Sequence, residues 1–109
     1  FKGNRIPGAP LLLERLDGMG RKGVLATVAT CSGTDAAAAE VIRRIGAVAE
    51  AMEGAAVLHV ASAFSCPALE LRVISNTTGE RAHQTWALDE AFDTLQSIIP
   101  ELETRLQVM

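Results

Sequence analysis

Tyrosine is absent from this sequence, and the other aromatic residues are scarce, with three phenylalanines and one tryptophan among 109 residues. This scarcity argues against a binding surface built on aromatic side chains. Basic residues are not in excess either, because ten lysines and arginines face thirteen acidic residues and leave a net charge of −3. Without a basic stripe, nucleic acid and anionic membranes are not expected as the main partners.

Cysteine and histidine are equally sparse, with two residues of each. Cys31 and Cys66 lie far apart in the sequence, and neither belongs to a CxxC or Cys/His ligand spacing. We therefore expect two free, mostly buried thiols in a reducing compartment. His59 and His83 are also isolated, so the sequence predicts no metal site and no cofactor.

Targeting signals and long hydrophobic runs are missing too. The first ten residues lack the charged-then-apolar pattern of a signal peptide. The longest apolar run, residues 54–64, is too short to span a bilayer. These absences predict a soluble, cytoplasmic protein with no membrane partner.

The chain is rich in small apolar residues, since 49% of it is hydrophobic and alanine is abundant. Its length suits one domain. Apolar segments bounded by turn residues predict three strands, at residues 24–30, 47–51 and 69–75. Other segments predict helices, which begin at residue 10, at residue 34 or 35, at residue 54 and after residue 85. This alternation indicates an α/β fold with a mostly parallel sheet.

Local signals mark the helix ends. Pro10 suits the first turn of a short helix. Thr34 or Asp35 can cap the second helix, which Gly46 can end. The third helix, which Pro67 ends, is apolar on every side and is expected to be buried.

The last helix, for which Thr85 is the predicted cap, has the clearest periodicity in the chain. Its apolar residues step by four and three and share one face that we expect to lie against a sheet or a partner. They are Leu88, Phe92, Leu95, Ile99, Leu102 and Leu106. Pro100 is expected to kink or break this helix.

The three predicted strands are apolar on both faces, which is unusual for so small a sheet. They would leave two bare edges, and bare edges invite pairing with further strands. We therefore expect this chain to form part of a larger sheet.

In open parallel sheets, ligands bind beyond the carboxyl ends of the strands. The segments that follow the predicted strands are CSGTD (31–35), AMEG (51–54) and SNTTGER (75–81). Glu53 then lies at the start of a buried helix, where the helix dipole favours an anion. Its carboxylate can accept hydrogen bonds from a pair of sugar hydroxyls, or it can cap its own helix. The spacing leaves both interpretations open.

Asn76 also has two interpretations. It is either a turn residue after a strand, or an amide whose donor and acceptor match O6 and protonated N7 of a purine. The backbone N–H groups of the CSGTD segment can cradle a flat ring or a phosphate. Glu70 and Arg72 share one strand face and are expected to pair with each other.

The stretch AMEGAAVLHVASAFSCPALELRVISN (51–76) resembles the C-terminal half of the nucleoside phosphorylase and nucleosidase superfamily. In that superfamily an M-E-G/A helix start precedes an R-x-I-S-[DN] strand end. From about residue 24 onward, TCSGTD, EAMEGAAV and RVISNTTGERAHQTW are most similar to its futalosine hydrolase family. The resemblance implies half of a three-layer α/β domain. It also implies hydrolysis of the N-glycosidic bond of futalosine, which releases hypoxanthine in menaquinone biosynthesis.

The resemblance further implies roles for single residues. Glu53 matches the glutamate that hydrogen-bonds the ribose hydroxyls, and Asn76 matches the Asp or Asn on the N7 side of the purine; these are the predicted catalytic residues. An amide that donates to O6 fits a 6-oxopurine, and a 6-aminopurine would be mispaired at a cost of about 1–3 kcal/mol. The other predicted substrate-binding residues are Met52, which matches the methionine beneath the sugar, and Ser32, Gly33 and Thr34.

The superfamily's N-terminal half carries a glycine-containing loop and the residue that orients the attacking water, and nothing in residues 1–109 matches either. We therefore expect this chain to be inactive without that half, and the complete protein to be a homo-oligomer that binds a purine nucleoside. The alternatives are a methylthioadenosine/adenosylhomocysteine nucleosidase, a purine nucleoside phosphorylase, and a non-catalytic nucleoside-binding or oligomerisation module.

Overall fold

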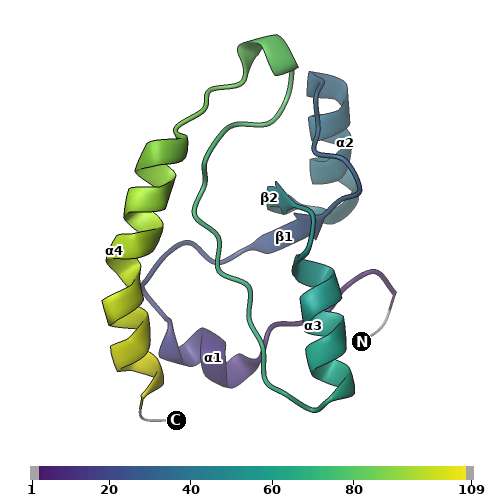
Figure 1. Ribbon diagram of the computed structural model, residues 1–109. Helices are drawn as coiled ribbons and strands as arrows, with labels where there is room; N and C mark the ends of the chain where they lie inside the picture. The colour runs from purple at the N-terminus through teal and green to yellow at the C-terminus, as the bar shows by residue number, and fades with distance from the viewer. Residues whose placement is uncertain (1–2, 108–109) are drawn as a thin grey trace.

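A computed structural model describes residues 3–107 of the chain. Its elements, labelled in Figure 1, alternate helix and strand in the first half of the chain. They are α1 (Pro10–Arg15), β1 (Val24–Thr27), α2 (Asp35–Ile45), β2 (Ala47–Ala51), α3 (Gly54–Ala63), the 3-10 helix η1 (Arg81–His83) and α4 (Leu88–Leu106). β1 and β2 form a parallel two-stranded sheet, with α2 as the crossover between them. The predicted α/β class with a parallel sheet is confirmed.

The register of the sheet sets the position of the candidate site. Ala26 is the partner of Glu50, and Thr27 is the partner of Ala51, with one irregularity near the start of β1. The pairing extends one residue further, where the N–H of Val28 donates to the carbonyl of Ala51 at 2.8 Å. The carboxyl ends of β1 and β2 therefore lie at the same edge of the sheet.

The boundaries of α2 follow the predicted signals. The Thr34 hydroxyl accepts a hydrogen bond of 3.1 Å from the N–H of Ala37, which satisfies one of the free donors of the first turn. Gly46 ends the helix in the left-handed conformation, with φ of 65°, and its N–H donates to the carbonyl of Ile42. Thr34 is thus the cap, and the predicted stop at Gly46 is confirmed.

The third predicted strand, residues 69–75, is wrong. In the structure this segment runs as an irregular connection between the turn after α3 and η1 (Figure 1). An apolar extended segment becomes a strand only where a neighbouring backbone takes its N–H and C=O groups. Residues 69–74 belong to no strand and no β-bridge; further along this segment, Asn76 forms a bridge with Trp86.

The last helix begins later than predicted and continues past Pro100 without a break. Thr85 does not cap it, because α4 begins after Ala87 and Thr85 bonds instead to Thr77 through its N–H and its carbonyl. The helix continues through Pro100, so the predicted break does not occur. The turn after the proline is stabilised by Arg105, which pairs with Glu101 at 2.7 Å and donates to carbonyls at the end of α1.

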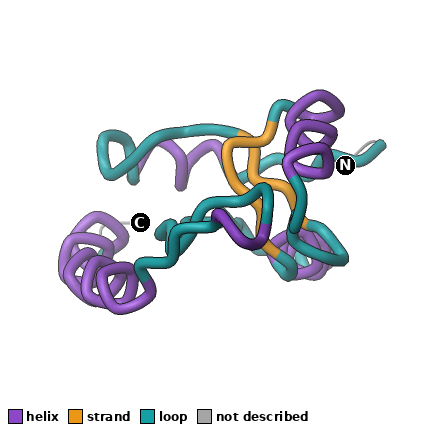
Figure 2. Tube along the Cα trace, turned by 90° about the horizontal axis from the view of Figure 1, so that it is seen from above, coloured by secondary structure: helices purple, strands orange, loops and turns teal. Residues whose placement is uncertain are grey.

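Little apolar surface is buried in residues 3–107. Ala26 and Ala91 are the buried hydrophobic residues of that range. The prediction that α3 is buried is wrong, since Val57, Val60 and Phe64 are exposed, the last to 80%. On α4, Leu88, Phe92, Leu95, Ile99 and Leu106 are exposed, so this face does not lie against the sheet, and its predicted cover by a partner stays a prediction. Figure 2 shows α4 standing apart from the sheet.

Cys31 and Cys66 are free thiols, as predicted, but both are exposed. Cys31 lies in the loop after β1, and Cys66 lies in the turn after α3. The prediction that they are mostly buried is therefore wrong.

Residues 1–109 produced alone are expected to be aggregated, poorly folded or bound to another chain. The radius of gyration is 15.0 Å, against about 13 Å for a compact chain of this length, and the exposed apolar faces of α3 and α4 favour association. Size-exclusion chromatography and thermal unfolding test this expectation. A monomer with one cooperative transition in dilute solution would contradict it.

Candidate functional site

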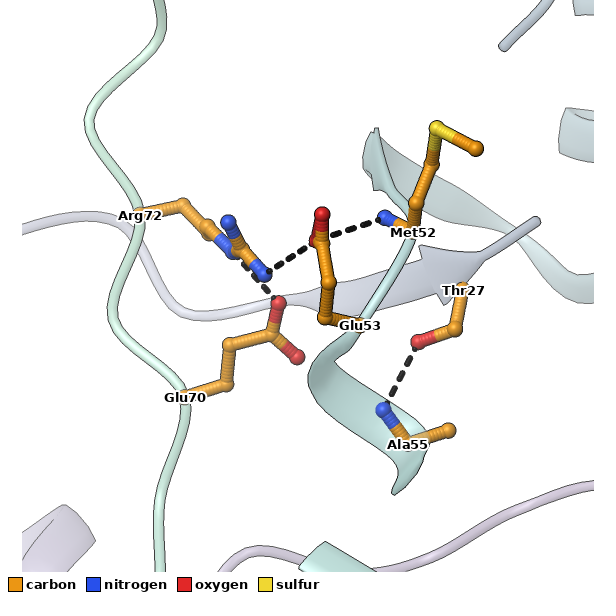
Figure 3. Close-up of polar contacts among 6 residues, drawn as sticks. All are labelled: Thr27, Met52, Glu53, Ala55, Glu70 and Arg72. Atoms are coloured by element: carbon orange, nitrogen blue, oxygen red, sulfur yellow. Dashed lines mark hydrogen bonds and ion pairs between the residues drawn. The ribbon is translucent and has the colours of Figure 1, made fainter. Parts of the chain in front are cut away.

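The edge of the sheet where β1 and β2 end is also where α3 begins. The Thr27 hydroxyl, at the end of β1, accepts a hydrogen bond of 2.9 Å from the N–H of Ala55 in the first turn of α3. One strand thus caps the helix that follows the other strand, as Figure 3 shows. This bond fixes the start of α3 relative to the sheet.

Glu53 immediately precedes α3, and its carboxylate faces solvent rather than the helix. Its side chain makes no capping hydrogen bond, so the interpretation that it caps its own helix is wrong. Its Oε2 accepts a bond of 3.2 Å from the N–H of Met52 and contacts Nη2 of Arg72 at 3.4 Å (Figure 3). The side chain is 68% exposed. Both contacts are made by one oxygen.

Arg72 joins two carboxylates at this edge. Its Nε donates to Oε1 of Glu70 at 2.6 Å, and its Nη2 reaches Glu53 at the longer distance given above. The hydrogen bond to Glu70 is the main cause that raises the pKa of Arg72 above its usual value, so the guanidinium stays charged. The predicted pairing of Glu70 with Arg72 is confirmed.

Glu70 is the carboxylate that lies against the start of α3. Its side chain is only 14% exposed, and a Cβ atom placed on the buried Gly54 would overlap the Glu70 carboxylate. The positive end of the helix dipole favours an anion at this position. The sequence had suggested Glu53 for this place, whereas the structure gives it to Glu70.

Replacement of Gly54 by Ala in the complete protein is therefore expected to lower the free energy of unfolding by about 1–3 kcal/mol, because the new methyl group must displace the Glu70 carboxylate. Gly20→Ala is the matched control, since a Cβ atom there meets nothing within 4 Å. Chemical denaturation of both variants measures the effect. Equal stabilities would show that Glu70 does not pack on Gly54.

The loop after β1 is held by a residue of β2. Glu50 accepts two hydrogen bonds from Ser32, one from its backbone N–H at 2.8 Å and one from its hydroxyl at 2.7 Å. Ser32 is buried at 6% exposure. The Ser32 N–H, one of the predicted cradle donors, is thus engaged within the loop, and the Thr34 hydroxyl caps α2.

The segment around η1 rests on this same loop. The N–H of Arg81 donates to the carbonyl of Gly33 at 3.0 Å, and the side chain of Gln84 donates to the carbonyls of Ser32 and Gly79 at 3.2 and 3.0 Å. The Asp35 carboxylate accepts a bond from the N–H of Glu80. The loop after β1 and the segment 79–84 are therefore in contact, although residues 69–75 do not form the strand that was predicted to bring them together.

Asn76 lies where two short backbone segments pair. It forms an antiparallel bridge with Trp86, its Nδ2 donates to the carbonyl of Thr77 at 2.9 Å, and its Oδ1 accepts from the Ser75 hydroxyl at 2.7 Å. Within residues 3–107, no hydrogen bond joins Asn76 to Glu53. Arg72, which contacts Glu53, lies four residues before Asn76 on the same segment.

Glu50 and Gln84, which hold the loops of the candidate site in place, were not predicted to do so. Glu50 carries the only charge in the predicted strand 47–51, and a lone carboxylate in an apolar strand was the signal that a polar partner lies nearby. Gln84 was placed in a loop without a role, and nothing in its sequence context indicated that it joins the two loops.

No group of three or more His, Cys, Asp or Glu side chains in residues 3–107 could hold a metal ion. No helix in that range is long and apolar enough to cross a membrane.

The geometry of this edge can be compared with known proteins. The sequence pattern of the phosphorylase superfamily matches residues 13–104, which is most of the chain and includes all the candidate residues from Ser32 to Asn76. The chain belongs to the phosphorylase superfamily. The match covers the end of β2, the Met-Glu-Gly start of α3 and the segment that carries Arg72.

Two curated members of the superfamily are similar to this chain. A futalosine hydrolase of Streptomyces coelicolor is 39% identical over 104 residues, which are 94% of this chain and 44% of that protein. A futalosine hydrolase of Acidothermus cellulolyticus is 44% identical over 75 residues, which are 68% of this chain and 31% of that protein. The chain thus spans less than half the length of these relatives. No solved structure matches it at a significant level.

Proposed function

We propose that the complete protein containing this chain hydrolyses the N-glycosidic bond of futalosine and releases hypoxanthine, as a step of menaquinone biosynthesis. The observation that carries the proposal is the similarity to two futalosine hydrolases at 39% and 44% identity. The local geometry is compatible with it, because the exposed carboxylate of Glu53 follows β2 and the segment that continues from Asn76 to Gln84 contacts the loop after β1.

The arrangement of Glu53 supports a role in binding the ribose hydroxyls. Its side chain is exposed, and Met52 and Arg72 both contact Oε2. Oε1 has no partner among the described residues and can accept a hydroxyl. Hydrogen bonds to the sugar that strengthen in an oxocarbenium-like transition state supply several kcal/mol in related glycoside chemistry. Met52 is 51% exposed beside it and is proposed to pack beneath the sugar.

The amide of Asn76 supports recognition of a 6-oxopurine. An asparagine amide has two N–H donors and two acceptor lone pairs, and Thr77 and Ser75 use one of each. The remaining N–H can donate to O6 of hypoxanthine, and the remaining lone pair can accept from protonated N7. Because the Ser75 hydroxyl donates to Oδ1, it fixes the orientation of the Asn76 amide.

The proposed chemistry divides between these two residues. Asn76 stabilises the leaving base on its N7 side, and Glu53 stabilises the sugar as positive charge develops on it. An amide cannot supply a proton at neutral pH, so N7 is protonated by solvent or by another group. The residue that orients the attacking water is proposed to lie in the part of the protein outside these residues.

The exposed surfaces of the chain support its place as part of a larger domain. A hollow of about 790 Å³ lies between β1, α3 and residues 4–8, and β1 has no strand on its outer edge within residues 3–107. The apolar faces of α3 and α4 are exposed as well. We propose that the N-terminal half of the domain covers the hollow and that the complete protein is a homo-oligomer.

A substrate panel tests the proposed function. The complete protein is incubated separately with futalosine, methylthioadenosine and adenosylhomocysteine, and the released bases are separated by chromatography. We expect release of hypoxanthine from futalosine and at most slow release of adenine from the other two. Preferential release of adenine would overturn the assignment. Nucleoside binding without release of any base would indicate a binding module.

A further inference from the structure

Glu53 and Glu70 share one guanidinium, but they share it unequally. Arg72 lies 2.6 Å from Glu70 and 3.4 Å from Glu53. The Glu70 side chain is 14% exposed and is packed against Gly54, whereas the Glu53 side chain is 68% exposed. Figure 3 shows Arg72 and Glu70 projecting from the same extended segment toward Glu53, with contacts from Arg72 to both carboxylates. The tighter and more buried contact is thus the one to Glu70.

We infer that Glu70 is a positioning residue that holds Arg72 in place and thereby keeps Oε1 of Glu53 free for a sugar hydroxyl. The inference rests on the proposed role of Glu53 in binding the ribose. Glu70 itself is assigned no substrate contact, because its carboxylate is bonded to Arg72 and packed against the start of α3.

The physical reason lies in the geometry of arginine–carboxylate pairs. A guanidinium presents its N–H donors as a planar fork that matches both oxygens of one carboxylate. With its Nε held by Glu70, Arg72 reaches Glu53 through Nη2 alone and contacts only Oε2. If the bond from Glu70 were weakened, Arg72 could turn its fork onto Glu53 and engage both oxygens. The ribose would then have to compete with an intramolecular ion pair.

Gly54 has a second part in this arrangement. A side chain at this position would overlap the Glu70 carboxylate, so the glycine is what lets Glu70 lie close to the helix start. Gly54→Ala should therefore displace Glu70 and reproduce, by a steric route, the loss of hydroxyl recognition that removal of the Glu70 charge causes.

The inference is tested with Glu70→Gln in the complete protein, which keeps the volume of the side chain and removes its charge. The rates are measured for futalosine and for 2′-deoxyfutalosine. The wild type is expected to prefer the ribonucleoside by roughly tenfold or more, as one hydrogen bond to a charged acceptor gives. In Glu70→Gln, KM for futalosine is expected to rise about tenfold with little change for the deoxy compound. The preference then largely disappears.

Three further variants make the test specific. In a Glu53→Gln background, Glu70→Gln should have little additional effect, because the two residues act in one unit. Gly54→Ala should also reduce the preference for the ribonucleoside. Glu101→Gln is the control, since it removes a carboxylate of a similar ion pair on α4, 2.7 Å from Arg105, and should leave the preference unchanged.

The outcomes separate this inference from the proposed function. A wild type that releases hypoxanthine with the expected preference, together with a Glu70→Gln variant that keeps that preference, overturns the inference alone. A wild type that releases no hypoxanthine overturns the proposed function and this inference with it. Additive effects of Glu70→Gln and Glu53→Gln would also overturn the inference.

Discussion

Replacement of Glu53 by Gln in the complete protein is expected to lower kcat/KM for futalosine by roughly a hundredfold. A hydrogen bond to a charged acceptor contributes about 1.5–3 kcal/mol, and the bond to a sugar hydroxyl strengthens in the transition state. The amide keeps the shape of the side chain but presents a neutral oxygen. Steady-state kinetics on futalosine measures the effect.

The free energy of unfolding of Glu53→Gln shows whether a loss of activity comes from a destabilised fold. Glu53 is exposed and its contact with Arg72 is 3.4 Å long, so its loss should change the free energy of unfolding by at most about 1 kcal/mol. Denaturation curves for the wild type and the variant provide this control. Activity within twofold of the wild type, with an intact fold, would show that Glu53 does not bind the substrate.

Replacement of Asn76 by Asp should change which base is released. A carboxylate presents only acceptors, so it mispairs with O6 of hypoxanthine and suits the exocyclic amine of adenine. The ratio of kcat/KM for hypoxanthine and adenine nucleosides is expected to fall by about ten- to a hundredfold, as one or two mispaired hydrogen bonds give.

The measurement compares release of hypoxanthine and adenine from otherwise identical nucleosides by the wild type and the variant. Gln96→Glu is a suitable control, because it makes the same amide-to-carboxylate change at an exposed residue of α4. An unchanged ratio in Asn76→Asp would mean that Asn76 only shapes the turn, and that the base is chosen elsewhere.

Features that depend on neighbours in the sequence could be predicted well. The cap of α2 at Thr34 and its stop at Gly46 need only residues within four positions, and both occur as expected. The parallel pairing of β1 with β2 followed from the strand–helix–strand order, because such a crossover places two strands side by side.

Features that depend on distant partners could not be predicted as well. Residues 69–75 have the composition of a strand, but a strand also needs a neighbour, and none lies beside residues 69–74 within the described chain. The burial of α3 was predicted wrongly, and the apolar face of α4 does not lie against the sheet, because sequence periodicity does not say which chain segment covers an apolar face.

In the candidate site too, features set by sequence neighbours could be predicted and features set by distant residues could not. The placement of Glu53 at a strand end followed from the order of elements, but its orientation is decided by Met52 and by Arg72, nineteen residues further along the chain. The sequence indicated an anion at the start of α3 and could not say that Glu70, rather than Glu53, takes that place, because only the folded chain brings Glu70 onto Gly54.

Product analysis in water enriched in ¹⁸O tests the proposed hydrolysis most directly. The complete protein is incubated with futalosine, with and without phosphate, and the base and the sugar product are identified by mass spectrometry. We predict hypoxanthine and a sugar product that carries one ¹⁸O atom, at a rate that does not depend on phosphate. A sugar phosphate, a reaction that requires phosphate, or the absence of hypoxanthine would contradict it.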